Sequence, residues 1–298
     1  MQRRTLPAIF TLIACVGQTF AQVQPQPVAP QPVPPTVDAP PPVHPSPDPK
    51  GPILQRQELE GGLIVEDLRI GTGPEVPKDA QIVMDYSARL KADGKEFRST
   101  YAIGQPMPME LRNAIKGMRA GVPGMRLGGM RRITIPSALA FGPTGLKQEK
   151  GKAMVVPPDA DVVFLVEAHD MVRIDDVVVG TGDPLVGRFV TTGTFKITDA
   201  QGKILEGALD PKNPYIWVHG EYQPMDFALE GMKPGGKRRI EVPKEFALAK
   251  GLGKFHPVNQ RVIIEFDMMH WRSIDVDNQK PLPPVDTPSG QDPKTEAQ

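Results

Sequence analysis

The sequence predicts an α+β protein built from two copies of one domain, each an antiparallel sheet wrapped around a single short helix. An internal repeat, strand-like alternation of apolar and polar residues, and one apolar stripe at helical spacing support this prediction. The 298 residues are enough for two domains with separate cores. Because 35 basic residues balance 35 acidic ones, the chain is not expected to bind nucleic acid through bulk charge.

The first 21 residues predict a cleaved export signal. They begin with a basic segment and continue in an apolar run that is too short to span a bilayer. Ala21 offers a cleavage site before Gln22, whereas the segment ending at Cys15 resembles a bacterial lipobox in which Cys15 is lipidated. Both routes lead to the periplasm or cell envelope, and the sequence leaves them open.

Proline-rich segments flank the repeat. Of residues 22–52, 13 are proline, so residues 22–58 are predicted to form an extended linker, and residues 274–298 a disordered tail. The single cysteine excludes an internal disulfide, and the five histidines show no metal-ligand spacing, so neither metal nor cofactor is expected. No long amphipathic helix precedes the repeat, and we therefore expect a monomer.

The repeat divides the remaining chain into residues 59–172 and residues 173–273. Three motifs recur in the same order 107 to 109 positions later, and the longest of them keeps most of its thirteen residues. Such recurrence indicates two related domains rather than one large fold. The recurring pairs are Ile70–Gly73 with Val179–Gly182, Asp93–Lys95 with Gln201–Lys203, and Gly124–Pro136 with Gly231–Pro243.

Each copy is expected to follow one plan along the chain. Residues 82–90 alternate as a strand with one buried and one mainly wet face, and a turn at residues 92–95 leads into the next strand. Apolar residues from Leu111 to Val122 recur at helical spacing and predict one short helix. Residues 132–135 alternate again, and residues 160–166 read as a strand that is apolar on both faces. In the second copy, the last strand is expected to bury Val262, Ile264, Phe266 and Met268.

Over residues 61–172 the first copy resembles a peptidyl-prolyl cis-trans isomerase domain of the FKBP family. The resemblance depends on the order and spacing of several motifs rather than on any single one. These motifs are Gly62–Leu68, Gly71–Gly73, Asp93–Phe97, Gly124–Met125, Gly128–Arg132, Ile135–Gly142, Val156–Ala160 and Val163–Glu167.

The resemblance implies an enzyme that rotates X-Pro amides (EC 5.2.1.8) by binding the twisted amide in an apolar pocket. No bond is broken in this reaction, so no nucleophile, metal or acid–base pair is needed. The pocket residues that the family implies fall into two groups. The catalytic group is Tyr86, Phe97, Phe141 and Phe164, and the substrate-binding group is Met107, Met109, Ile115, Met118, Val155 and Val156.

Several residues depart from the family pattern. Arg98 stands where an acidic residue is usual, Met118 replaces the aromatic floor, and Phe141 replaces a tyrosine whose hydroxyl meets the substrate carbonyl. Met107 and Met109 replace two wall aromatics and keep the pocket apolar. A missing hydrogen bond costs roughly 1 kcal/mol, so we expect isomerase activity that is weak or lost.

The second copy is expected to be a degenerate, catalytically inactive FKBP-like domain with a structural or client-binding role. Its Lys237–Arg239 run is expected to lie on a solvated strand edge, and Tyr215 and Trp217 fall at wall positions. The alignment replaces four pocket residues: Tyr86 by Gly193, Phe97 by Leu205, Phe141 by Leu248 and Phe164 by Ile264.

The sequence thus favours an exported isomerase that acts on unfolded or nascent exported polypeptides containing proline. The alternative is a non-catalytic chaperone or scaffold module in the cell envelope, and a cell-wall component is a third interpretation that rests on the linker alone. In each case the only membrane contact expected is a lipid anchor at Cys15.

Overall fold

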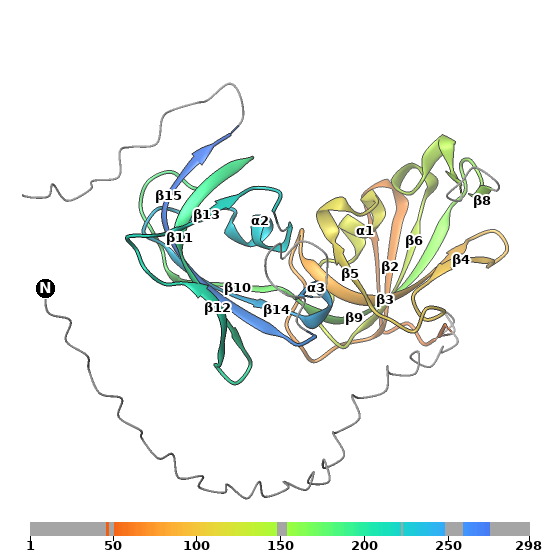
Figure 1. Cartoon of the computed structure of the whole chain (residues 1–298). Helices are drawn as coiled ribbons and strands as arrows, with labels where there is room; N and C mark the ends of the chain where they lie inside the picture. Colours follow the sequence, from red (N-terminus) through yellow and green to blue (C-terminus); the bar gives the residue numbers. More distant parts are fainter. Residues whose placement is uncertain (1–45, 48–50, 148–153, 222, 248–258, 275–298) are drawn as a thin grey trace, which may run out of the picture. The chain divides into compact units, whose positions relative to one another are not determined.

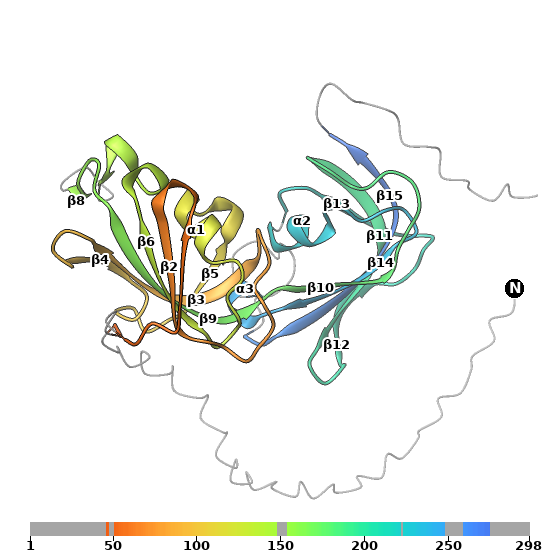
Figure 2. The same cartoon turned by 180° about the vertical axis from the view of Figure 1, so that it is seen from behind.

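The structure is a computed structural model that describes residues 46–47, 51–147, 154–221, 223–247 and 259–274 (Figures 1 and 2). The predicted export signal with Cys15, most of the proline-rich linker, Leu248 and the tail beyond residue 274 lie outside the described residues. Within them, no helix is long and apolar enough to cross a membrane.

The first sheet is antiparallel and has seven strands. Its strand order is β1-β2-β6-β9-β3-β4, with β5 pairing on β3, so that strands distant in sequence become neighbours. A two-stranded hairpin, β7 with β8, stands apart from it. The strands are β1 (Gln55–Leu59), β2 (Leu63–Arg69), β3 (Gln81–Leu90), β4 (Glu96–Ser99), β5 (Met107–Glu110), β6 (Met130–Ile135), β7 (Leu146–Lys147), β8 (Met154–Val156) and β9 (Val162–Met171).

The second sheet repeats this order without a counterpart of β1. It runs β10-β14-β15-β11-β12, with β13 pairing on β11, so each strand has an equivalent in the first sheet. Antiparallel sheets with few helices confirm the predicted fold class. The strands are β10 (Arg173–Val178), β11 (Phe189–Asp199), β12 (Ile204–Ala208), β13 (Tyr215–Val218), β14 (Lys237–Val242) and β15 (Val262–Ser273), and the helices of the two units are α1 (Lys116–Gly121), α2 (Gln223–Leu229) and α3 (Lys244–Ala247).

Helix α1 is shorter than the apolar stripe from Leu111 to Val122 suggested. The Leu111 amide donates to Ala80 O and so prolongs the pairing of β5 with β3, and a single 3₁₀ turn follows at residues 111–113. The helix begins only after Ile115, which is still extended. It packs directly on β6, because a β-carbon on Gly117 would lie 2.2 Å from Cγ2 of Ile135.

The inner face of the first sheet forms the core, as the alternation of β3 predicted. Ile82, Met84 and Ala88 are fully buried there. The outer face of β3 departs from the prediction, because it is not wet: Val83 and Ser87 are each 1% exposed. In the second sheet, Val262, Ile264, Phe266 and Met268 are buried as predicted.

One buried arginine clamps the main helix onto each sheet. In the first sheet, Arg131 of β6 forms a two-pronged ion pair with Asp67 of β2 and also donates to the carbonyls of Gly121 and Pro123, where α1 ends. Cationic donors suit these carbonyls, which have no partner within the helix. Arg238 makes the same contacts with Asp176, Ala228 O and Glu230 O. The prediction of a solvated edge at Lys237–Arg239 is therefore wrong for Arg238, which is 7% exposed.

Candidate functional site

Two aromatic rings from neighbouring strands form the floor of the candidate site. Tyr86 of β3 lies opposite Val166 of β9, and Ala88 lies opposite Phe164, so both rings stand on the inner face of the sheet. Their centroids are 5.9 Å apart, and Tyr86 is 3% and Phe164 7% exposed. The period of two in each strand is sufficient to place them on the same face.

Two further rings stand at the more open side of this floor. Phe97 of β4 packs edge-on against Phe164 at 6.4 Å and against Phe141 at 6.1 Å, which is the usual geometry for aromatic pairs. A β-bulge between β3 and β4 makes Phe97 an extra residue and turns its ring toward the inner face. The four predicted catalytic residues thus come together in what we call the aromatic cluster, Tyr86, Phe97, Phe141 and Phe164.

The predicted substrate-binding residues surround this cluster with one exception. Met118 and Val156 are buried in the same apolar core as Tyr86, and three partly buried residues pack against it. Val155 does not belong to that core, because alternate residues of a strand point to opposite sides and Val156 already points inward. The three partly buried residues are Met107, Met109 and Ile115.

Tyr86 carries the hydroxyl closest to the aromatic cluster. It donates to the Met107 sulfur at 3.8 Å and accepts from the Arg98 guanidinium. Burial raises the pKa of Tyr86, and the charge of Arg98 only partly opposes this effect. The hydroxyl therefore stays protonated at neutral pH, and because a thioether is a weak acceptor, it can readily turn to a stronger one.

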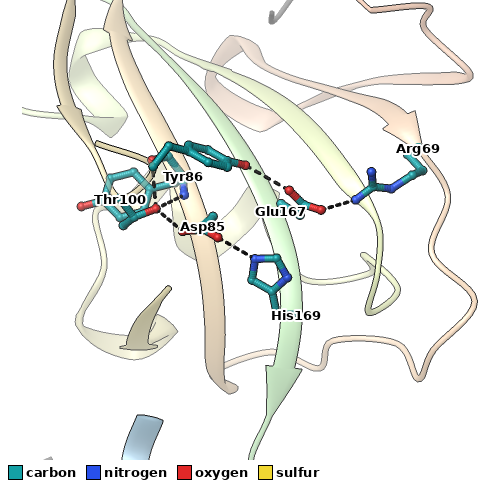
Figure 3. Close-up of polar contacts among 7 residues, drawn as sticks. Arg69, Asp85, Tyr86, Thr100, Glu167 and His169 are labelled. Carbon is teal, nitrogen blue, oxygen red and sulfur yellow. Dashed lines mark hydrogen bonds and ion pairs between the residues drawn. The ribbon is translucent and has the colours of Figure 1, made fainter. Parts of the chain in front are cut away.

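A polar network on the outer face holds the backbone of Tyr86 in place (Figure 3). The Tyr86 amide donates to Thr100 Oγ1 at 2.9 Å, and the Thr100 amide donates back to Tyr86 O at 2.9 Å. The Thr100 hydroxyl also donates to Asp85 Oδ1 at 2.6 Å, and the other oxygen of Asp85 contacts His169 Nε2 at 2.8 Å. The sequence interpretation missed these residues, although Asp85 and His169 are polar residues within otherwise apolar strands.

A second part of this network joins β2 to β9. Arg69 forms an ion pair with Glu167 and also donates to Gly128 O at 2.8 Å. The Tyr101 hydroxyl donates to the other oxygen of Glu167 at 3.2 Å, and burial together with that carboxylate raises the pKa of Tyr101 far above its ordinary value. These contacts cover the outer face of the strand that carries Tyr86, which explains why this face is dry.

The second sheet carries a different set of residues at the equivalent positions. Its strand register places Phe195 opposite Phe266 as Tyr86 lies opposite Val166, so the counterpart of Tyr86 is Phe195 and not Gly193 as the sequence alignment gave. The motif offset is 109 around Gly71 and 107 around Gly124, and the larger value applies on this strand. Leu205, at the Phe97 position, agrees with the sequence alignment.

An aromatic group nevertheless survives in the second sheet. Tyr215 packs against Phe195 at 5.2 Å and against Trp217 at 6.1 Å, and both are at the register positions of Met107 and Met109. The Trp217 indole donates to Asp226 at 3.0 Å, while burial raises the pKa of Asp226. Over the described residues, no three His, Cys, Asp or Glu side chains gather as a metal site would require.

Comparisons with known proteins identify the first sheet. A family model for FKBP-type peptidyl-prolyl cis-trans isomerases matches residues 73–169. An FK506-binding protein of Neisseria meningitidis serogroup B is 38% identical over 109 residues, which are 36% of this chain and 94% of that protein. A 46 kDa FK506-binding nuclear protein of Spodoptera frugiperda is 30% identical over 118 residues, which are 39% of this chain but only 27% of the relative. A solved isomerase structure from Pseudomonas syringae pv. tomato has 28% identity and a TM-score of 0.34, covering 39% of this chain and 80% of that one.

Four aromatic rings over a buried floor define a domain that binds apolar segments without a nucleophile of its own. The family match and the near-complete alignment to the Neisseria protein then make the assignment specific. The chain belongs to the FKBP-type peptidyl-prolyl cis-trans isomerase family. Membership places it in the enzyme class EC 5.2.1.8.

Proposed function

We propose that the first sheet catalyses cis–trans isomerisation of X-Pro bonds in unfolded polypeptides, and that the aromatic cluster is where it does so. The observation that supports this most directly is the meeting of Tyr86, Phe97, Phe141 and Phe164 within 6.4 Å centroid contacts on one face. A rigid sheet fixes two of these rings, and the bulge in β4 orients a third.

The proposed mechanism lowers the rotational barrier through differential binding. An X-Pro amide rotates over a barrier of about 20 kcal/mol because the planar form is stabilised by resonance. An apolar surface strips water from the planar amide, which costs the more polar planar form most, and it holds the proline ring by dispersion contacts. The Tyr86 hydroxyl, now bonded only to a thioether acceptor, can donate to the rotating carbonyl.

Phe141 sets the expected strength of this activity. It lies at the rim of the aromatic cluster, where a tyrosine would offer a second hydroxyl donor. A hydrogen bond of this kind contributes about 1 kcal/mol, which corresponds to a rate factor of about five. We therefore propose an active but modest isomerase, and Phe141→Tyr should raise its rate several-fold.

Exchange NMR on an Ala-Leu-Pro-Phe peptide with the full chain tests the proposal. Phe97→Ala should lower kcat/KM about tenfold, because it removes the contacts with both Phe141 and Phe164. The control is Ile103→Ala, since Ile103 is 64% exposed and lies outside the aromatic cluster, and its rate should equal that of the wild type. An unchanged rate in Phe97→Ala would place the activity elsewhere.

A second candidate function is the binding of unfolded clients without catalysis. Ile204, Leu209 and Ile216 of the second unit are each more than half exposed, and side chains of this kind suit contact with unfolded segments. Suppression of client aggregation that survives Phe97→Ala but is lost in Ile204→Ser/Ile216→Ser would assign this function to the second sheet.

We also propose that the clients are exported polypeptides. The support is the signal-like character of residues 1–21, with processing either before Gln22 or at Cys15. Cell fractionation of the wild type and Cys15→Ser separates the two routes, because only lipidation places the wild type, and not the variant, in the membrane fraction.

A further inference from the structure

Arg98 stands on the same face of the sheet as the aromatic cluster. It lies directly opposite Ala88 of β3, and Ala88 in turn lies directly opposite Phe164 of β9. Residues directly opposite one another in an antiparallel pair share a face, so the three form one row across three strands. Arg98 also donates a hydrogen bond to the hydroxyl of Tyr86. A fixed positive charge therefore borders the floor of the candidate site.

No acidic side chain in the described part of the chain forms an ion pair with this guanidinium. The nearest carboxylate along the strand, Glu96, is on the opposite face, where it accepts from Ser87 at 2.9 Å and from Arg89 at 3.1 Å. The segment that carries Phe141, residues 137–147, has Lys147 as its one charged residue. The rim formed by these segments is thus positively charged, and Arg98 itself is exposed to an incoming ligand.

The sheet architecture does not require a cation at this position. In the second sheet, the residue opposite Ile197 is Glu206, exactly as Arg98 is opposite Ala88, so the same register position carries the opposite charge. Arg98 contributes to no buried clamp of the kind that Arg131 makes. Its charge is therefore available to select what binds.

We propose that Arg98 makes the first-sheet site select proline-containing segments that carry an acidic residue next to the proline. The inference rests on the proposed function, since it assumes that an X-Pro segment lies across the aromatic cluster. With the proline ring over Phe164 and Phe97, the flanking side chain extends along the row toward Ala88 and Arg98. A carboxylate there gains a charge-assisted hydrogen bond, whereas a lysine meets a like charge.

The expected selectivity is moderate because Arg98 is exposed. Exposed ion pairs stabilise weakly and are screened by salt, but attraction of glutamate and repulsion of lysine act in opposite directions and therefore add in their ratio. We expect kcat/KM for an Ala-Glu-Pro-Phe peptide to exceed that for Ala-Lys-Pro-Phe by about fivefold at low salt. The ratio should fall toward one in 0.5 M NaCl.

The test measures exchange NMR rates and peptide dissociation constants with the full chain and three peptides, Ala-Glu-Pro-Phe, Ala-Leu-Pro-Phe and Ala-Lys-Pro-Phe. Arg98→Gln should bring the glutamate-to-lysine ratio to about one, and Arg98→Glu should invert it. The matched control is Arg126→Glu, which makes the same change in net charge at an exposed turn beside a different cavity, and it should keep the wild-type ratio. Glu206→Gln should also keep it, because that residue belongs to the second sheet.

The leucine peptide separates failure of this inference from failure of the proposed function. Turnover of the leucine peptide with equal rates and affinities for the glutamate and lysine peptides overturns the inference and leaves the isomerase intact. An unchanged ratio in Arg98→Glu overturns it as well. If no peptide is isomerised but the glutamate peptide binds in an Arg98-dependent manner, the selectivity is supported and catalysis is refuted. Absence of both turnover and binding refutes both.

Discussion

Replacing Arg131 by methionine would leave the Asp67 carboxylate buried without its cation. The native guanidinium bonds to both Asp67 oxygens, at 2.6 and 3.0 Å, and to the carbonyls of Gly121 and Pro123 at 2.9 and 3.1 Å. The side chains of Arg131 and Asp67 are only 8% and 10% exposed, so water cannot replace the lost partner. The second sheet offers a natural comparison, because Arg238 makes the same four contacts.

The exposure of the two carboxylates sets the expected difference. Removing one partner of a buried ion pair costs about 3–5 kcal/mol, and we expect Arg131→Met to fall in that range. Asp176 is 44% exposed and can be rehydrated when Arg238 is lost. The cost of Arg238→Met is then mainly that of two carbonyls losing a donor, about 1–3 kcal/mol.

Urea denaturation followed by two probes measures both costs. The two tryptophans of the chain, Trp217 and Trp271, both lie in the second sheet, so their fluorescence reports its unfolding, while far-ultraviolet circular dichroism reports both sheets. Arg131→Met should move the circular dichroism transition and leave the fluorescence midpoint in place, and Arg238→Met should move the fluorescence midpoint. A cost for Arg131→Met that is equal to or below the cost for Arg238→Met would refute the reasoning.

Two further variants test the outer-face network and a close approach of the backbone. Because the pKa of Tyr101 is raised in the folded state, its contribution to stability is complete below its ordinary value of 10.0 and is lost as pH rises above it. The unfolding free energy of the wild type should therefore fall more steeply from pH 10 to 11 than that of Tyr101→Phe, by up to about 1.4 kcal/mol per pH unit, and equal slopes would contradict this. Gly71→Ala would place a β-carbon 2.2 Å from Leu127 O and should cost more than 2 kcal/mol on thermal or urea unfolding, roughly twice the cost of Gly94→Ala, whose β-carbon meets nothing within 4 Å and which pays only for its φ of +71°. Equal losses in the two glycine variants would show that the contact at Gly71 relaxes.

The aromatic cluster was accessible to sequence reasoning because its members stand on elements with simple periods. Tyr86 and Phe164 occupy inward positions of two alternating strands, and motif spacing related them to Phe97 and Phe141. The position of Val155 was misjudged, since two adjacent valines in a strand cannot both face inward.

The second sheet shows where sequence alignment becomes unreliable. Its motif offset drifts from 109 to 107 residues, and assigning one offset to all strands paired Tyr86 with Gly193. The strand register instead pairs it with Phe195. A change of two residues keeps the face of a strand, so the alternation pattern gave no warning of the error.

By itself the sequence determined the repeat, the antiparallel α+β class and the inward faces of the strands, because these follow from local periodicity and motif order. Only the tertiary structure decided which polar residues are buried and what they hold. Asp85, Thr100 and His169 look like a wet face along the chain, yet they fix the backbone of Tyr86 from behind. Residues distant in sequence create this environment, and a period of two cannot record which segment covers the outer side of a sheet.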